Sequence, residues 1–345
     1  MKVLLPILMW PLSLCADLRL NQIQMIGTHN SYHVAPTAAE MKFLGMFSKE
    51  ATTAWDYSRR PLDQQLEDGS RHFELDVFAD PKGGLFAKSD DPVGSPMRKP
   101  GIKVLHVPKI DARSTHPTFK GALNAVKKWS FKNRNHLPIM ILVELKDRAE
   151  NPLAPKPVKF DRGQMETLEK EILSVLKLER IITPDLVRGN EATLRDAIRK
   201  KGWPTLEKCR GKIMFCLDNE GSHRDEYLKG NGTLEKRLLF VSVRPEHPAA
   251  AWMKRNDPVG GFHEIRNLVK AGFMVRTRAD ANTVEARAND KVRSSKALAS
   301  GAQFVSTDFP NKVARISEYE VRLPDRAVAR ANPVSAPKLK GETVK

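Results

Sequence analysis

The sequence predicts an α/β fold, either a closed (β/α)8 barrel or an open doubly wound sheet. Short apolar runs alternate with helical stretches along most of the chain, which is the pattern of βα units. Eight runs have the length of a strand, and eight is the number that a closed barrel needs. The 345 residues, of which 41% are hydrophobic, can form the core of one large barrel. The alternation by itself fits both architectures.

The expected strands are the apolar runs at residues 23–26, 72–78, 103–107, 139–145, 212–217, 238–243, 273–277 and 303–306. The expected helices lie between them, at residues 62–68, 118–129, 164–178, 191–201, 262–270 and 293–299. The last two stretches are followed by Gly272 and Gly301, and glycine is a usual C-terminal stop for a helix.

The N-terminus has the features of a secretory signal peptide at residues 1–16. It carries one positive charge, an apolar segment too short to span a bilayer, and small residues before Asp17. Cleavage after Ala16 predicts a secreted or periplasmic protein. A lipoprotein anchor at Cys15 is the alternative, but Leu14 is bulkier than such a processing site usually accepts.

The remaining chain divides into a catalytic domain at residues 17–321 and a tail at residues 322–345. The tail is basic and lacks apolar periodicity, so we expect it to be disordered. Cys209 and Cys216 flank the start of one apolar run, and an extended segment of that length holds them roughly 20 Å apart. This is beyond disulfide reach, so we expect two separate buried thiols.

The net charge of +17 implies an anionic partner. Nucleic acid is not expected, because there is no helix-turn-helix, zinc-finger or RNP pattern and aromatic residues make up only 7% of the chain. Anionic lipid headgroups and a phosphodiester substrate explain the charge equally well. Patterns of nucleotide-binding P-loops, serine hydrolases and zinc proteases do not occur either.

Polar side chains end several of the apolar runs. The C-terminal ends of barrel strands converge on one face, so these residues are expected to form one site. Carboxylates and an amide oxygen suit Ca²⁺ or Mg²⁺, whereas the lack of thiols argues against a structural zinc. The histidines are then available for proton transfer. The residues are His29, Asn30, Glu74, Asp76, His106 and Glu144.

The ordered set of motifs resembles the X-type catalytic barrel of phosphatidylinositol-specific phospholipases C. It is most similar to the Ca²⁺-dependent, single-domain family of secreted microbial enzymes. The resemblance covers roughly residues 20 to 320 and favours the closed barrel over the open sheet. It is carried by Gly-Thr-His-Asn-Ser-Tyr-His at 27–33, Glu-x-Asp at 74–76, Lys-Val-Leu-His-Val-Pro at 103–108, Glu-Leu-Lys-Asp at 144–147, Lys-Arg-Asn-Asp-Pro at 254–258, Val-Arg-Thr-Arg-Ala-Asp at 275–280 and Ser-Gly-Ala-Gln-Phe-Val-Ser-Thr-Asp at 300–308.

The resemblance implies roles for these residues in cleaving phosphatidylinositol to diacylglycerol and inositol 1,2-cyclic phosphate. His29 would donate to a phosphate oxygen and His106 would protonate the leaving diacylglycerol oxygen. The base toward the inositol 2-hydroxyl would be Glu74 or Glu144. Ca²⁺, with Mg²⁺ compatible by residue type, would bind to Asn30, Glu74, Asp76 and Glu144.

Three cations are candidates for binding the substrate: Lys146, Arg278 and Arg276. Each also has an ion-pair alternative, Lys146 with Glu144, and the arginines with Asp280 or Asp308. Tyr32 and His33 are expected to support His29 by hydrogen bonding. The enzyme would act as a monomer at a membrane surface. The long loop at 80–101 would cover the active site or touch lipid, or else be a solvated excursion.

Two alternatives remain. A glycerophosphodiesterase or phospholipase D-like barrel is disfavoured because glycerophosphodiesterases typically have His-Arg at the first strand end, where this chain has His29-Asn30. A non-catalytic barrel that binds lipid or inositol phosphate is disfavoured because a pure binder does not need both His29 and His106.

Overall fold

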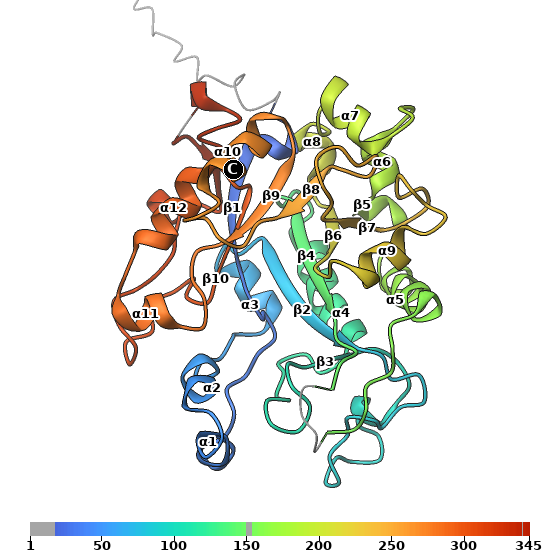
Figure 1. Ribbon diagram of the computed structural model, residues 1–345, viewed down its shortest axis with the longest axis vertical. Coiled ribbons are helices and arrows are strands. Elements are labelled where there is room, and N and C mark those ends of the chain that lie inside the picture. Colours follow the sequence, from blue (N-terminus) through green and yellow to red (C-terminus); the bar gives the residue numbers. More distant parts are fainter. Residues whose placement is uncertain (1–17, 150–153, 340) are drawn as a thin grey trace, which may run out of the picture.

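The computed structural model describes residues 18–149, 154–339 and 341–345 (Figure 1). The expected signal peptide at residues 1–16, including Cys15, lies outside these ranges. Among the helices described, none is long and apolar enough to cross a membrane.

Eight parallel strands form the centre of the molecule. Ladders join β2, β4, β6 and β7 in one half, and β8, β9, β10 and β1 in the other. β1 also contacts β2, and β7 contacts β8, so the strands follow one another in barrel order. The predicted (β/α)8 fold class is confirmed, with two seams where the ladder is interrupted. The strands are β1 (Ile23–Thr28), β2 (His72–Phe78), β4 (Ile139–Leu145), β6 (Ile213–Leu217), β7 (Leu239–Val241), β8 (Trp252–Lys254), β9 (Met274–Arg278) and β10 (Phe304–Thr307).

One expected barrel strand is wrong and one barrel strand was missed. The run at residues 103–107 forms only β3 (Lys103–Val104), which pairs antiparallel with the end of β2. Its place in the barrel is taken by β8, which has three residues. A strand this short cannot show an alternation of apolar and polar residues, so periodicity did not reveal it. A further short strand, β5 (Ile181–Ile182), pairs with the start of β6.

The seam between β1 and β2 depends on Gly27. A Cβ atom at this position would lie 2.1 Å from the carbonyl oxygen of His72, so only glycine permits this approach. The amide of Arg71 donates to the carbonyl of Ile26 at 2.9 Å, one residue earlier. The C-terminal end of β1 therefore lies beside the start of β2, and His29, which follows β1, comes within reach of Glu74 in β2.

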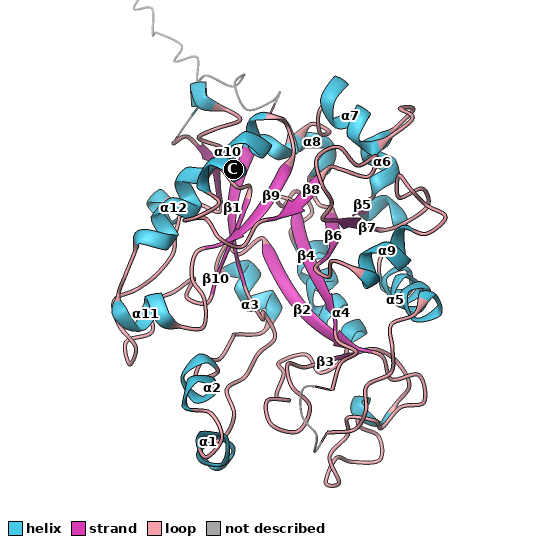
Figure 2. Ribbon diagram, viewed as in Figure 1, coloured by secondary structure: helices cyan, strands magenta, loops and turns pink. Residues whose placement is uncertain are grey.

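Helices surround the strands (Figure 2). The six helices expected from sequence correspond to α3, α4, α5, α7, α10 and α12. The α-helices are α1 (Ala38–Gly45), α2 (Lys49–Ala54), α3 (Leu62–Glu67), α4 (Phe119–Lys132), α5 (Arg162–Val175), α6 (Pro184–Arg188), α7 (Leu194–Lys200), α8 (Leu206–Cys209), α9 (Ser222–Leu228), α10 (Phe262–Lys270), α11 (Val284–Ala288) and α12 (Val292–Ser300). Short 3-10 turns are η1 (Leu20–Gln22), η2 (Pro96–Arg98), η3 (Leu178–Arg180), η4 (Pro324–Arg326) and η5 (Pro337–Leu339).

The C-terminal segment differs from the expected disordered tail. β11 (Ala329–Ala331) pairs antiparallel with β1, and β12 (Thr343–Val344) pairs with β11. Asn332 is fully buried, and its amide donates to the carbonyl of Gly301 at 2.7 Å. The packed unit therefore extends well beyond residue 321. The segment was expected to be disordered because of its basic composition, but it contains the short strand β11, in which Ala329 and Ala331 are buried.

Cys209 and Cys216 are both free and buried, as expected. They belong to α8 and β6, respectively.

Candidate active site

His29 follows β1 directly and is oriented by Asp308, which follows β10. The parallel pairing of these strands places the two residues side by side. His29 Nδ1 lies 2.9 Å from Asp308 Oδ1, so this nitrogen carries the proton that the carboxylate accepts. Nε2 lies 3.6 Å from Glu74 Oε1, across the seam to β2. Burial and the nearby Arg278 lower the pKa of His29, so the ring is neutral at pH 7 and its Nε2 lone pair faces the site.

Two arginines hold Asp308 in its ionised form. Arg59 donates to Asp308 Oδ1 at 2.8 Å and to the carbonyl of His29 at 3.0 Å. Arg278 Nη2 lies 3.6 Å from Asp308 Oδ2 and 3.4 Å from His29 Nδ1. Burial opposes ionisation of Asp308, but His29 and the two arginines outweigh it and lower its pKa. Arg278 remains partly exposed beside His29, so it is open to the substrate-binding role expected from the sequence.

Arg276 differs from its expected role in substrate binding. Its side chain is 1% exposed and bonds to Glu74 Oε2 and to the side chain of Asn256. Its ion-pair partner is therefore Glu74, and not Asp280 or Asp308 as the alternative interpretation expected. Burial opposes ionisation of Glu74, but Arg276 and His29 bring its pKa down to about 2. Arg276 therefore fixes Glu74 as a carboxylate and is closed off from a substrate.

Glu74, Asp76 and Glu144 form a cluster that we call the acidic trio. β2 and β4 pair in register with Asp76 opposite Glu144, and oxygens of all three lie within 4.8 Å of one another. Burial, and then Glu144, raise the pKa of Asp76; burial also raises that of Glu144. Lys146 lies 3.3 Å from Glu144 and 3.6 Å from Asp76, which is the ion-pair alternative that the sequence left open.

The acidic trio fits a hard divalent cation. Asp76 Oδ1 is buried and has no hydrogen-bond partner among the residues described. Repulsion from Glu144 contributes to the raised pKa of Asp76, and a bound divalent cation would relieve it. An unpaired carboxylate oxygen in this position is what Ca²⁺ or Mg²⁺ would bind.

Asn30, the fourth expected metal ligand, is held in place by Tyr57 and by its neighbour Ser31. It adopts a left-handed backbone conformation with φ of 43°, which asparagine tolerates better than most residues. Its amide nitrogen donates to Tyr57 Oη at 3.2 Å, so its Oδ1 is the atom that can serve as a ligand. The next residue, Ser31, bonds to the backbone of Glu74 through both its amide and its hydroxyl. Asn30 is thereby tied to the strand that carries two members of the trio.

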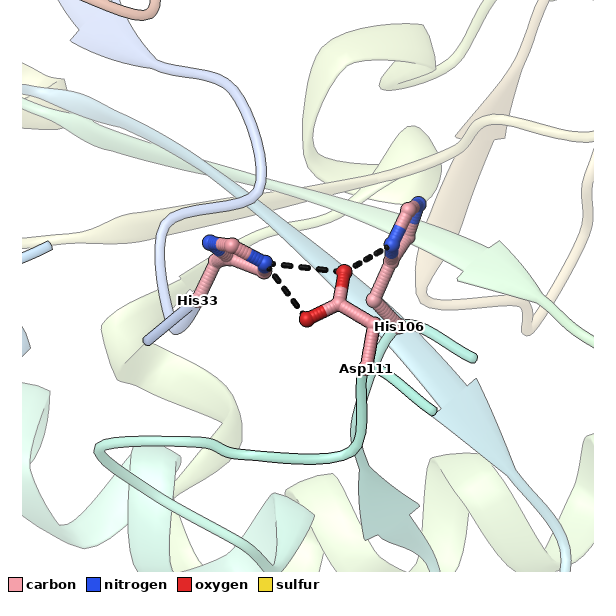
Figure 3. A group of neighbouring side chains, drawn as sticks. All are labelled: His33, His106 and Asp111. Carbon is pink, nitrogen blue, oxygen red and sulfur yellow. Dashed lines mark hydrogen bonds and ion pairs between the residues drawn. The ribbon is translucent and has the colours of Figure 1, made fainter. Parts of the chain in front are cut away.

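His106 is oriented by Asp111, which also binds His33 (Figure 3). His106 Nδ1 lies 2.6 Å from Asp111 Oδ2, and its Nε2 lies on the opposite edge of the ring. His33 Nε2 lies 2.8 and 2.9 Å from the two oxygens of Asp111. The expectation that His33 supports His29 is therefore corrected: it supports His106 through Asp111. Burial opposes ionisation of Asp111, but the two histidine hydrogen bonds lower its pKa.

Tyr57 connects Asn30 to the group formed by His33, Asp111 and His106. Tyr57 binds Asn30 through its hydroxyl and His33 through its carbonyl, and Arg59 stacks 4.5 Å from its ring. Tyr32 is fully buried, and among the residues described its hydroxyl has no hydrogen-bond partner, so it does not support His29 as expected. Through Tyr57, the group of His106, Asp111 and His33 is joined to Asn30.

Sequence reasoning missed the orienting residues. Asp308 entered only as an alternative ion-pair partner, although its place directly after an expected strand marked it as a candidate. Asp111 lies five residues beyond His106, in a loop, and nothing local distinguishes it. Tyr57 and Arg59 carry no sequence signal.

The family model described as "Phosphoinositide phospholipase C, Ca2+-dependent" matches residues 18–333. No curated protein matches the chain in sequence.

Solved structures of bacterial enzymes have a similar fold. One is a calcium-dependent phosphoinositol-specific phospholipase C from a Gram-negative Pseudomonas species, with 14% identity, a TM-score of 0.55, and coverage of 92% of this chain and 97% of that one. Its myo-inositol complex matches with the same identity and TM-score and covers 92% and 96% of the two chains. A Ca²⁺-dependent phosphatidylinositol-specific phospholipase C from Streptomyces antibioticus has 16% identity, a TM-score of 0.53, and coverage of 84% and 95%.

Proposed function

Because the chain belongs to the family of Ca²⁺-dependent phosphoinositide phospholipases C, we propose that it cleaves phosphatidylinositol or a related inositol phospholipid. The products would be diacylglycerol and inositol 1,2-cyclic phosphate or inositol phosphate. The observation that carries this proposal is the combination of two histidines, each oriented by its own aspartate, with the acidic trio. This arrangement supplies proton transfer and a cation site together.

In the proposed first step, the inositol 2-hydroxyl oxygen attacks phosphorus and the bond from phosphorus to the diacylglycerol oxygen breaks. His106 is the acid: Asp111 accepts from Nδ1, so Nε2 delivers the proton to the leaving oxygen. His29 Nε2, fixed by Asp308 on the other ring nitrogen, faces the phosphate. A bound phosphodiester anion favours a proton on this nitrogen, which then donates to a non-bridging oxygen.

The proton of the 2-hydroxyl passes to a carboxylate. Glu144 is better placed for this than Glu74, because its side chain is 30% exposed and Glu74 already binds Arg276. We therefore assign Glu144 as the base. Arg278, beside His29, is the cation that we assign to the phosphate or an inositol hydroxyl.

The residues that would hold Ca²⁺ are Asn30, Glu74, Asp76 and Glu144. When bound, the ion neutralises phosphoryl charge and lowers the pKa of the 2-hydroxyl. The oxygen-only ligand set and the unpaired Asp76 Oδ1 support a hard cation, and Mg²⁺ shares these requirements.

An exposed apolar tip on the first βα excursion supports a membrane surface as the partner. Phe43, Met46 and Phe47 are 40%, 68% and 74% exposed, at the end of α1 and just after it. They follow β1 in the chain, and thus the strand end that bears His29. Lys88, in the loop between β2 and β3, lies 4.0 Å from Glu40 of α1, and the two segments project from the same end of the molecule (Figure 1). Insertion of the apolar tip into lipid would bring the site to its substrate.

The protein would work as a secreted or periplasmic monomer. The leader on which this localisation depends lies outside the described part of the chain.

The test is release of water-soluble inositol phosphate from phosphatidylinositol vesicles by the mature protein, with Ca²⁺ or with a chelator. We expect Ca²⁺-dependent release that falls roughly 10²- to 10⁴-fold in His29→Ala, with the thermal unfolding transition retained. No release in the presence of Ca²⁺ would refute the substrate. Release that persists in chelator would refute the role of the cation.

A further inference from the structure

His33 is fully buried, and both of its ring nitrogens face oxygen atoms that accept hydrogen bonds. Nδ1 lies 3.0 Å from the carbonyl oxygen of Tyr57. Nε2 lies 2.8 and 2.9 Å from the carboxylate oxygens of Asp111. The two contacts lie on opposite edges of the ring, so one N–H group cannot serve both.

A neutral imidazole has one N–H donor and one lone pair. In either neutral tautomer, the lone pair of His33 would face an oxygen at 3.0 Å or less. The Tyr57 carbonyl has no proton to give. Asp111 accepts from two histidines, which keeps its carboxylate ionised. The contacts are satisfied only when both nitrogens of His33 carry protons.

His136 provides a comparison within the same molecule. It is also buried, and its Nδ1 lies 2.7 Å from the carbonyl of Leu137. Its Nε2 lies 2.8 Å from the hydroxyl of Ser130, which can donate as well as accept. A neutral ring satisfies both contacts there, and burial lowers the pKa of His136 to about 4. The partner on Nε2 is therefore what distinguishes the two histidines.

We propose that His33 is a constitutive imidazolium whose charge cancels that of Asp111 and thereby sets the acidity of His106. His33 is a positioning residue, since it acts on His106 through Asp111. The inference rests on the proposed function, in which His106 delivers a proton from Nε2. With His33 protonated, the pair of His33 and Asp111 is neutral overall, and Asp111 still orients His106 through the 2.6 Å contact to Nδ1.

The other groups around the two histidines are uncharged or paired elsewhere: Arg59, whose amide donates to the carbonyl of His33 at 2.7 Å, pairs with Asp308. Trp55 packs its ring edge against His106 at 5.3 Å and carries no charge. The hydroxyls of Tyr57 and Tyr32 stay neutral, because burial raises the pKa of both well above the usual value. Asp111 is thus the anion in direct contact with both rings, and the ring centroids of His33 and His106 are 5.9 Å apart.

The positive charge on His33 keeps protonated His106 from becoming too weak an acid. If His33 were neutral, the full charge of Asp111 would stabilise the protonated form of His106. An opposite charge this close shifts a titration by about 1–3 pH units. His106 would then release its proton to the leaving oxygen less readily.

The experiment is NMR of the imidazole nitrogens in ¹⁵N-histidine-labelled mature protein between pH 5 and 9, without added metal and with chelator. The variants are His33→Gln, which retains a neutral donor, and His136→Gln as the matched control. We expect both nitrogens of His33 to carry protons near neutral pH. In His33→Gln, the titration midpoint of His106 should move up by at least about one pH unit. In the control it should stay in place.

Activity gives a second readout, because a merely structural role would lower the rate without moving its pH profile. The alkaline limb for release of inositol phosphate should move up in His33→Gln. It should return toward the wild-type position in the double variant His33→Gln/Asp111→Asn, in which both charges are absent.

If either ring nitrogen of His33 is unprotonated at pH 7 in the wild type, the proposal is overturned. This measurement does not require any variant to fold. An unchanged midpoint of His106 in His33→Gln would also overturn the proposal. His33, His106 and Asp111 also lie close enough together to hold a metal ion. If both nitrogens of His33 carry protons only after a chelator has removed a metal, that metal is the cation between the residues, and the proposal is overturned. If the protein releases no inositol phosphate, the proposed function fails, while the NMR result still decides the charge on His33.

Discussion

Replacing His136 with glutamine should make the stability of the protein less sensitive to acid. The ring of His136 lies between α4 and β4, where its two nitrogens bond to Leu137 and Ser130. Burial, the largest effect, lowers the pKa to about 4 from the ordinary value of 6.5. The unfolded chain therefore binds a proton below pH 6.5 that the folded protein does not. The contribution of the neutral ring is complete above pH 6.5 and is lost as the pH falls toward 4.

The size of the effect follows from the two pKa values. At pH 5 nearly all unfolded chains, but only about a tenth of folded ones, carry the proton. Relative to pH 7.5, this lowers the free energy of unfolding by about 2 kcal/mol. Because other groups titrate over the same range, the informative quantity is the difference between wild type and variant.

The assay is urea denaturation of wild type and His136→Gln at pH 7.5 and pH 5. The loss of unfolding free energy between these pH values should be smaller by about 2 kcal/mol in the variant, whatever its stability at pH 7.5. His263→Gln, on the exposed surface of α10, is the control for removal of one histidine. An equal loss in wild type and His136→Gln would refute the assignment of a neutral buried ring.

Three further predictions concern the site and its setting. Asp308→Asn removes the charge that orients His29, so kcat for inositol phosphate release should fall roughly 10- to 100-fold with thermal unfolding retained; an unchanged kcat would contradict this role. Phe47→Ser should weaken activity on vesicles by at least about tenfold and leave a soluble short-chain substrate unaffected, because burying a phenylalanine contributes roughly 1.5–3 kcal/mol; equal losses on both substrates would argue against membrane insertion. Gly27→Ala forces a Cβ against His72 and should lower the free energy of unfolding by about 1–3 kcal/mol or more in urea titrations; wild-type stability would show that the seam can open.

The sequence predicted the parts of the fold that depend on local pattern. Strands such as β2 and β4 are long apolar runs, and helices such as α10 have a clear amphipathic period, so both were located within a few residues. β8 and β11 were missed because three residues carry too little periodicity. In these short strands the pairing with a neighbour, rather than local preference, stabilises the extended conformation.

The candidate site divides in the same way. The motifs predicted which residues to expect at the site, namely His29, Asn30, the acidic trio and His106, because these residue types and their order are visible in the chain. Only the tertiary structure decided their partners. Asp308 reaches His29 across 279 positions, and Arg276 reaches Glu74 across 202.

The physical reason is that a partner is chosen by packing, and many carboxylates and arginines are equivalent in sequence. Arg276 and Arg278 lie two residues apart on one strand, yet one is buried against Glu74 and the other borders the site beside His29. The charge that we infer for His33 has the same origin. It follows from a carbonyl on one edge of the ring and a carboxylate on the other, and no local pattern specifies both.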